Sequence, residues 1–387
     1  MFTGVAFVIC SKVYIMHISN SVQQHNVQSH IDIHASSGDE TPAVENSKVK
    51  ISPQNILRQV HADIVREIKS SDIAESQKAG KLERLAVLQG RSEKQIARLM
   101  SHLESLYGDR KDFDEVAGSV LKTIVRAGLE RPEELAGLDA RRENNPSWYS
   151  SNKAIEGVIY VDQHCGTLDK LRGEINTFKA LNLKFLHFMP TIYQPTEGDD
   201  DGGYAIRDYR KVNPKIGSME QLKEIFTEMR KQGISPVMDV TLNHTAHDHP
   251  WAEAAKAGDP DKQAYYFFMD EDEKNEYQPH LTDIFPSIRK GSFTWNSDVS
   301  KYVWTTFKST QWDLNYANPD VLNSMLDELM FLANQGSEVL RFDAVSFIWK
   351  EKGTACFNQD NVTPLLHVFN AMAQIAAPGV VFKAESG

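Results

Sequence analysis

The chain has 387 residues, enough for one large domain and a smaller one. Its composition, with 41% hydrophobic and 25% charged residues, is typical of a globular protein. The formal net charge of −11 argues against a broad nucleic-acid surface, which requires clustered Lys and Arg, and suits an uncharged substrate.

The cysteines and the amino terminus bear on the compartment. The three cysteines, Cys10, Cys165 and Cys356, lie far apart and indicate neither a disulfide framework nor paired metal ligands. We therefore predict reduced thiols and a cytoplasmic protein. The short apolar stretch at residues 4–10 leaves secretion open, although it lacks the basic start and the cleavage site of a signal peptide. No segment reaches the about 18–20 apolar residues of a transmembrane helix.

Two regions precede the strand-rich part of the chain. Residues 1–51 are largely polar and show no helical or strand period beyond their first apolar stretch, which predicts a disordered lead-in. In residues 52–145 apolar side chains recur every three or four positions, as in Ile56, Val60 and Ile64. This pattern predicts several amphipathic helices in a helical N-terminal domain, and the absence of a strict heptad argues against a coiled coil.

From residue 146 to residue 387, short β-rich runs alternate with helical patterns. The runs predict five strands, at residues 158–161, 183–189, 235–240, 338–342 and 380–383. Helical patterns lie between them, for example at 219–232 and 318–335. This alternation predicts an α/β fold with parallel strands and crossover helices. The segment 243–316 is too long for a simple connection and is predicted to be an inserted subdomain.

Polar residues suited to catalysis follow these strands. In a barrel of parallel strands, catalytic side chains lie at the carboxyl ends of the strands. Arg341 and Asp343 are two residues apart on the fourth strand, so both face one side, and the guanidinium is expected to keep Asp343 ionised. Glu385 ends the fifth strand and is the candidate for a protonated partner. One charged and one neutral carboxyl group on adjacent strands are what retaining glycoside cleavage requires.

The motifs at these strand ends resemble those of glycoside hydrolase family 13, the α-amylase family. Three conserved regions of that family are matched by DVTLNH at 239–244, GSEVLRFDAV at 336–345 and FKAE at 382–385. Within the family the strongest resemblance is to the amylosucrases. It rests on DGGY at 201–204, WTTF at 304–307, QWDLNY at 311–316 and FIWK at 347–350.

The resemblance implies a (β/α)8 barrel and roles for three catalytic residues. Asp343 would be the nucleophile that forms a β-glucosyl ester. Glu385 would protonate the leaving fructose and then deprotonate the acceptor. Arg341 would orient the nucleophile.

The resemblance also implies a sugar-binding set and a supporting pair. The glucosyl unit would contact Asp201, Tyr204, His244 and Phe307, with Tyr204 stacking on the ring and His244 bonding to hydroxyl groups. Asp239 and Asn243 would hold the loop after the third strand rather than touch the substrate. The expected partners are sucrose and an α-glucan acceptor, with no nucleic acid and no membrane. Neither a cofactor nor a metal ion is expected.

The match ends at Glu385, after the fifth of eight barrel strands. The third catalytic carboxylate, and the arginine expected to pair with Asp201, have no counterpart in the sequence. We therefore expect an incomplete barrel, a fragment or incomplete gene model, with its first and fifth strands as unpaired edges. This chain alone is then expected to release no fructose from sucrose.

Several functions remain open at this point. One is a sucrose glucosyltransferase that releases fructose and extends an α-1,4-glucan, with a sucrose hydrolase or another enzyme of the family as the rival. The other is a catalytically silent fragment that only binds carbohydrate. Neither the acceptor nor the oligomeric state follows from the sequence.

Overall fold

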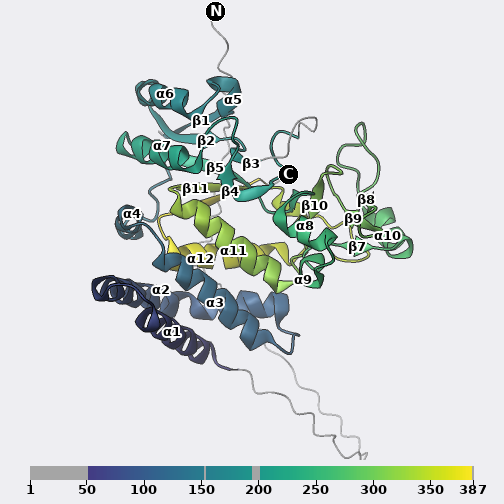
Figure 1. Cartoon of the computed structure of the whole chain (residues 1–387), viewed down its shortest axis with the longest axis horizontal. Coiled ribbons are helices and arrows are strands. Elements are labelled where there is room, and N and C mark those ends of the chain that lie inside the picture. Colours follow the sequence, from purple (N-terminus) through teal and green to yellow (C-terminus); the bar gives the residue numbers. More distant parts are fainter. Residues whose placement is uncertain (1–50, 152–153, 194–200, 386–387) are drawn as a thin grey trace, which may run out of the picture.

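The computed structural model describes residues 51–151, 154–193 and 201–385 (Figure 1). The predicted disordered lead-in therefore lies outside the described residues, except for residue 51. Within the described part, no helix is both long enough and apolar enough to cross a membrane.

A five-stranded parallel sheet forms the centre of the strand-rich part. It has the order β1-β2-β5-β11-β12, so β1 and β12 are its edges. Its strands are β1 (Ile155–Ile159), β2 (Leu183–Phe188), β5 (Ser235–Thr241), β11 (Val339–Asp343) and β12 (Val381–Ala384). The structure thus has the predicted α/β arrangement, and its five parallel strands are consistent with part of a (β/α)8 barrel.

The first strand differs from its prediction, whereas the other four begin and end within one residue of theirs. We predicted residues 158–161, but β1 begins at Ile155, and Val161 instead begins the short helix α5 (Val161–His164). The reason for the earlier start is that β1 is an edge strand, which among the described strands pairs only with β2, and that Ile155 at its start is 46% exposed. An exposed edge does not require the continuous apolar run that marks a buried parallel strand.

Helices connect successive strands. They are α6 (Leu168–Ala180), α7 (Met219–Lys231), α11 (Pro319–Asn334) and α12 (Val362–Ala376). Capping fixes where they begin: Ser218 accepts a hydrogen bond from Gln221 N, and the Gln221 side chain accepts one from Ser218 N. A small antiparallel pair, β3 (Ile192–Tyr193) and β4 (Asp208–Val212), lies between β2 and α7 in the chain.

The predicted insertion forms two small antiparallel sheets beside the main sheet (Figure 1). Strand β6 (His244–Ala246) pairs with β10 (Gln311–Asp313), which places His244 opposite Asp313 and closes the base of the insertion. Between these strands the chain forms α8 (Pro250–Lys256), α9 (Pro260–Gln263), β7 (Phe268–Met269), α10 (Glu271–Tyr277), β8 (Phe293–Asn296) and β9 (Lys301–Trp304).

In the described residues four amino-terminal helices precede the sheet, and they are α1 (Pro53–Ser70), α2 (Glu75–Tyr107), α3 (Phe113–Leu129) and α4 (Glu133–Glu143). Of these, α2 and α3 pack against α11 and α12, and α1 packs on α2 and α3 (Figure 1). Leu103 of α2 and Ile124 of α3 belong to the same buried apolar cluster as Phe369 of α12. The helices of residues 52–145 and the sheet therefore share one core, and their division into separate domains stays a prediction.

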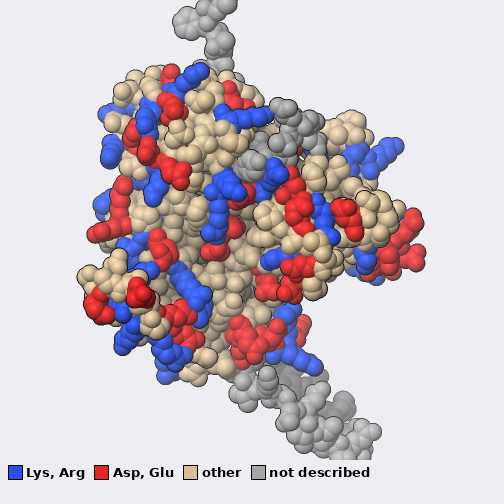
Figure 2. Space-filling model, viewed as in Figure 1, with Lys and Arg blue, Asp and Glu red and all other residues tan. Residues whose placement is uncertain are grey.

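Surface charge is mixed on the face shown in Figure 2. Lys and Arg alternate there with Asp and Glu, and acidic side chains gather over α10, whose first turn holds Glu271, Asp272 and Glu273. Such a face does not offer the broad basic surface that nucleic-acid binding requires.

A buried ion pair joins the amino-terminal helices to the barrel. Arg131, between α3 and α4, forms a bidentate pair with Asp139, with Nε–Oδ2 and Nη2–Oδ1 distances of 2.7 and 2.9 Å. Arg131 Nη1 also donates to the Ala333 carbonyl in α11, and Gly379 N donates to Asp139 Oδ1. The two side chains are 3% and 1% exposed, so each charge depends on the other for compensation.

Replacement of Asp139 by alanine is expected to destabilise the protein by about 3–5 kcal/mol, because it leaves the Arg131 charge buried and unpaired. Urea unfolding followed by circular dichroism measures this loss. Lys81→Ala is the matched control, because the nearby Lys81–Glu130 pair, between α2 and the end of α3, is exposed and should be worth less than about 1 kcal/mol. Equal losses in the two variants would contradict this account.

Candidate active site

A pocket of about 520 Å³ lies beside the carboxyl ends of β5, β11 and β12. Six of the residues predicted from the sequence line it: Asp201, Tyr204, His244, Phe307, Asp343 and Glu385. The other three, Asp239, Asn243 and Arg341, do not line it and lie behind its wall. The remaining lining residues are Phe285, Ile288, Lys308, Gln311, Ala344, Ser346 and Phe347.

Arg341 bonds to three carboxylates from three neighbouring strands. Its Nη1 donates to Asp239 Oδ1 at 2.7 Å and to Asp343 Oδ1 at 2.8 Å, and its Nη2 lies 2.8 Å from Glu385 Oε1. The sheet register sets Arg341 of β11 opposite Asp239 of β5, which explains the first contact. Asp239 also contacts His187 of β2, with Nε2 and Oδ2 3.0 Å apart. The site thus spans four of the five strands.

The protonation of Asp343 differs from the expectation that Arg341 keeps it ionised. Burial raises the pKa of Asp343 to about 8, because it removes the carboxylate from water. Arg341 lowers this pKa, but the charges of Asp239 and Glu385 and a hydrogen bond with Glu385 raise it further. One guanidinium shared by three carboxylates does not compensate them all. Asp343 is therefore expected to hold a proton at neutral pH.

Hydrogen bonds in the segment just before β4 hold the Asp201 carboxylate in a fixed orientation. Asp201 Oδ1 accepts from Gly203 N at 2.9 Å, and its Oδ2 accepts from Ala205 N at 2.7 Å and from Gln311 Nε2 at 2.9 Å. Gly202 and Gly203 have φ angles of +75° and +91°, a conformation that favours glycine. The tight loop brings Tyr204 to the pocket, where burial raises the pKa of its hydroxyl and keeps it neutral.

His244 is a neutral, buried ring at the pocket wall. Burial lowers its pKa to about 4, although Asp313 and Asp201 act in the opposite direction. Its Nδ1 lies 3.2 Å from Asn243 Nδ2. A backbone hydrogen-bonding contact with Tyr204 raises the pKa of the ring, but within the described residues no hydrogen bond of standard geometry reaches Nε2. Among the described residues, His244 Nδ1 therefore contacts Asn243, whereas Nε2 accepts or donates no such hydrogen bond.

Aromatic rings continue the wall from His244 outwards. The Phe307 ring lies 5.4 Å from that of His244 and 5.1 Å from that of Phe347, measured between centroids. Phe285 lies 6.2 Å from Phe307, and Phe357 lies 5.0 Å from Phe347. Sequence reasoning singled out Phe307 alone among these four. Phe347 stood within a quoted motif, but Phe285 and Phe357 carried no signal that distinguishes them from core aromatics.

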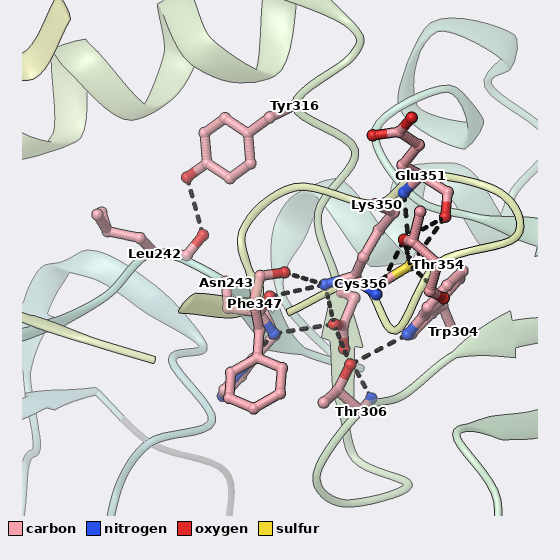
Figure 3. A network of polar contacts seen from close by, with 12 residues as sticks. Leu242, Asn243, Trp304, Thr306, Tyr316, Phe347, Lys350, Glu351, Thr354 and Cys356 are labelled. Carbon is pink, nitrogen blue, oxygen red and sulfur yellow. Dashed lines mark hydrogen bonds and ion pairs between the residues drawn. The ribbon is translucent and has the colours of Figure 1, made fainter. Parts of the chain in front are cut away.

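A buried polar network behind the pocket was missed by the sequence analysis (Figure 3). It centres on Lys350 and Asp313, whose side chains are 1% and 0% exposed and whose Nζ and Oδ2 atoms are 2.8 Å apart. Asp313 also accepts from Thr306 N and Oγ1 at 2.9 and 2.6 Å and from Asn243 Nδ2 at 2.9 Å. The network joins the insertion to the loops after β5 and β11. In the described part of the chain, no cluster of three or more His, Cys, Asp or Glu residues is arranged to hold a metal ion.

A parallel α/β sheet with paired carboxyl groups at its strand ends is the arrangement of a barrel enzyme. Comparison with protein families agrees with this class. Residues 142–374 match the alpha amylase catalytic domain, which is more than half of the chain. The chain belongs to the α-amylase family.

Curated relatives are similar to this chain over part of their length. The glucosylglycerate phosphorylase of Spirochaeta thermophila is 29% identical over 206 residues, which are 53% of this chain and 32% of that protein. The trehalose synthase/amylase of Mycolicibacterium smegmatis is 30% identical over 269 residues, which are 68% of this chain and 44% of that protein. The chain thus spans less than half of these relatives. Neither of them is an amylosucrase, so the closer resemblance found in the motifs stays a proposal.

Solved structures support the fold. A "Family GH13_31 enzyme" aligns with a TM-score of 0.53 and 23% identity, over 62% of this chain and 47% of that one. The trehalose-6-phosphate hydrolase of Bacillus licheniformis aligns with a TM-score of 0.51 and 22% identity, over 58% of this chain and 42% of that one. At these identities the likeness concerns the fold alone.

The pH dependence of stability tests the protonation of Asp343. A carboxyl group whose pKa rises from about 4 in the unfolded chain to about 8 in the folded one binds its proton more tightly when folded. Its contribution to stability is therefore complete below pH 4 and is lost as the pH rises towards 8. Asp343→Asn imitates the protonated form and removes this loss.

We therefore expect Asp343→Asn to gain on the order of 1–3 kcal/mol of stability relative to wild type between pH 5 and pH 8.5. Urea unfolding of both proteins at each pH measures the difference, in which the titrating groups outside the Arg341 cluster cancel. Parallel stability curves for the two proteins would show that Asp343 is ionised throughout this range.

Proposed function

We propose that this chain carries the glucosyl-binding and catalytic carboxyl groups of a retaining α-glucoside-active enzyme, most specifically a sucrose glucosyltransferase. The observation that carries this proposal is the placement of Asp343 and Glu385. They end adjacent strands, share the Arg341 guanidinium and line one pocket with four predicted sugar-binding residues. Two carboxyl groups at that position suit a double displacement, in which one attacks the sugar and the other transfers protons.

In the first step, the Asp343 carboxylate attacks C1 of the glucosyl unit and forms a β-glucosyl ester. The bond from C1 to the fructose oxygen breaks, and Glu385 donates a proton to that oxygen. The hydrogen bond between Asp343 and Glu385 offers a path for the proton of the pair to move to Glu385 before the attack. In the second step, Glu385 takes the proton from an acceptor hydroxyl, whose oxygen attacks C1 and frees Asp343. With the end of an α-1,4-glucan as the acceptor, the glucan grows by one unit.

Tyr204, His244 and Phe307 supply the walls for the glucosyl ring in this proposal. Neutral aromatic side chains contact the apolar faces of sugars, and the neutral His244 can donate one hydrogen bond to a hydroxyl group. Uncharged walls fit an uncharged sugar. The carboxyl groups that line the pocket are Asp343, Glu385 and Asp201, and the Asp201 carboxylate is held by its three hydrogen bonds.

The names of the relatives support a rival within the same reaction class. Trehalose synthases and glucosylglycerate phosphorylases are enzymes of α-glucosides other than sucrose. A sucrose hydrolase, in which water replaces the glucan, and a silent carbohydrate-binding protein are the further alternatives. These functions differ in the leaving group, in the acceptor and in whether an ester forms at all.

The test is covalent capture of the nucleophile. An α-glucosyl fluoride with a second fluorine at C5 forms the ester without proton donation, because fluoride leaves unaided, and the ring fluorine slows hydrolysis of the ester. We expect the folded chain to gain the mass of one fluoroglucosyl group on Asp343, detected by intact mass and peptide mapping. Glu385→Gln should still be labelled, whereas Asp343→Asn should not.

Competition between natural sugars and the labelling reagent identifies the preferred substrate. Sucrose is expected to slow the labelling more than trehalose or maltose at the same concentration. Stronger protection by trehalose would replace the sucrose assignment with the function named for the trehalose synthases. Labelling of Asp343→Asn, or a folded wild-type chain that gains no mass, would contradict the proposed nucleophile and favour the silent carbohydrate-binding alternative.

A further inference from the structure

Lys350 lies behind the pocket with every hydrogen of its ammonium group in use. Its Nζ donates to Asp313 Oδ2 at 2.8 Å, to Asn243 Oδ1 at 2.9 Å and to the carbonyl oxygen of Phe347 (Figure 3). A lysine ammonium has three hydrogens and accepts no hydrogen bond. Any atom that faces Nζ at this distance must therefore be an acceptor.

This requirement fixes the amide of Asn243. Oδ1 faces the ammonium, and Nδ2 faces Asp313 Oδ2 at 2.9 Å. A flipped amide would set its NH2 group against the ammonium and its oxygen against the carboxylate, so both contacts would become repulsive. Lys350 and Asp313, which form a buried ion pair, thus select one orientation of the amide between them.

The orientation of Asn243 in turn selects the tautomer of His244. The Asn243 Nδ2 atom carries a second hydrogen. The Nδ2 atom also lies 3.2 Å from His244 Nδ1, so this hydrogen is available for that contact. An amide NH2 only donates, so Nδ1 must be the unprotonated nitrogen of the ring. A neutral imidazole carries one hydrogen, which is then on Nε2. The His244 Nε2 atom is buried and makes no hydrogen bond of standard geometry with the described residues. The His244 side chain lines the pocket.

We propose that Lys350 is a positioning residue that fixes, through Asn243, the Nε2–H tautomer of His244, and so keeps a hydrogen-bond donor ready for a glucosyl hydroxyl. The role of the donor towards sugar rests on the function proposed above, whereas the tautomer itself does not. The chain of contacts is Lys350 to Asn243 to His244, and Lys350 reaches the sugar only through the other two.

The tautomer is measurable without a ligand. Long-range proton–nitrogen correlation spectra of protein labelled with ¹⁵N-histidine distinguish a protonated from an unprotonated ring nitrogen, and His244→Asn assigns the signals. We expect His244 of the wild-type protein to show Nε2–H alone. Lys350→Met removes the group that orients Asn243, and it should give signals of both tautomers. The affinity for methyl α-glucoside, measured by calorimetry, should fall about tenfold. The reason is that the His244 Nε2–H donor is absent in part of the population, and the freed Asn243 amide competes with the sugar for His244.

A second variant separates this role from simple loss of stability. Lys350→Met leaves Asp313 buried without its cation and should lower the urea midpoint. Lys350→Met combined with Asp313→Asn removes both charges, so the midpoint should return towards the wild-type value. The mixed tautomers and the weaker affinity should persist in the double variant. Lys352→Met, which removes an exposed lysine two residues away, is the control and should change neither quantity.

The outcomes are distinct for the two proposals. A single Nε2–H form in the double variant would overturn the inference and show that another group, such as the Tyr204 backbone, sets the tautomer. A wild-type ring with its hydrogen on Nδ1 would also overturn it. Wild-type protein that shows Nε2–H and binds no glucoside would contradict the proposed function instead, and mixed tautomers in the double variant would still support the positioning of His244 by Lys350.

Discussion

The reactive part of the pocket depends on one guanidinium shared by three carboxylates. Arg341 contacts Asp239, Asp343 and Glu385, and the register of β5 against β11 already fixes the first of these contacts. Because Asp343 is buried and shares this one positive charge with Asp239 and Glu385, the pKa of Asp343 is raised and its carboxyl group retains a proton. The same imbalance that lowers stability at high pH therefore supplies a proton at the place where a leaving group would require one.

A second charged cluster lies behind the pocket, and its positive and negative charges are balanced. Lys350 and Asp313 are matched one to one, and both are almost fully buried among groups that satisfy their remaining hydrogen bonds. The geometry of this matched pair is fixed by its hydrogen bonds. The site thus combines a balanced network, which holds Asn243 and His244 in place, with an unbalanced one, which has a proton to transfer. The two networks meet at adjacent walls of one pocket.

The sequence predicted what depends on local pattern and missed what depends on distant contacts. Four strands were predicted within one residue, because buried parallel strands are continuous apolar runs, and Asp343 and Glu385 were found because they follow such runs. Lys350 and Asp313 stood within quoted motifs, but their pairing was missed, since it carries no sequence period and Lys350 meets Asn243 across 107 residues. The raised pKa of Asp343 was missed for a related reason. It depends on how many carboxylates share Arg341, and that number exists only in the folded sheet.

The amino-terminal helices bear on the same site through α12. Ten of the fifteen residues of α12 are buried, more than a helix with one face towards a sheet and the other towards water would bury. The additional cover comes from α2 and α3, which pack on the side of α12 away from the sheet (Figure 1). Strand β12 follows α12 directly, and Glu385 follows β12. The position of Glu385 relative to Asp343 therefore rests in part on helices that contribute no residue to the pocket, and a change in their packing would reach the carboxyl pair through α12.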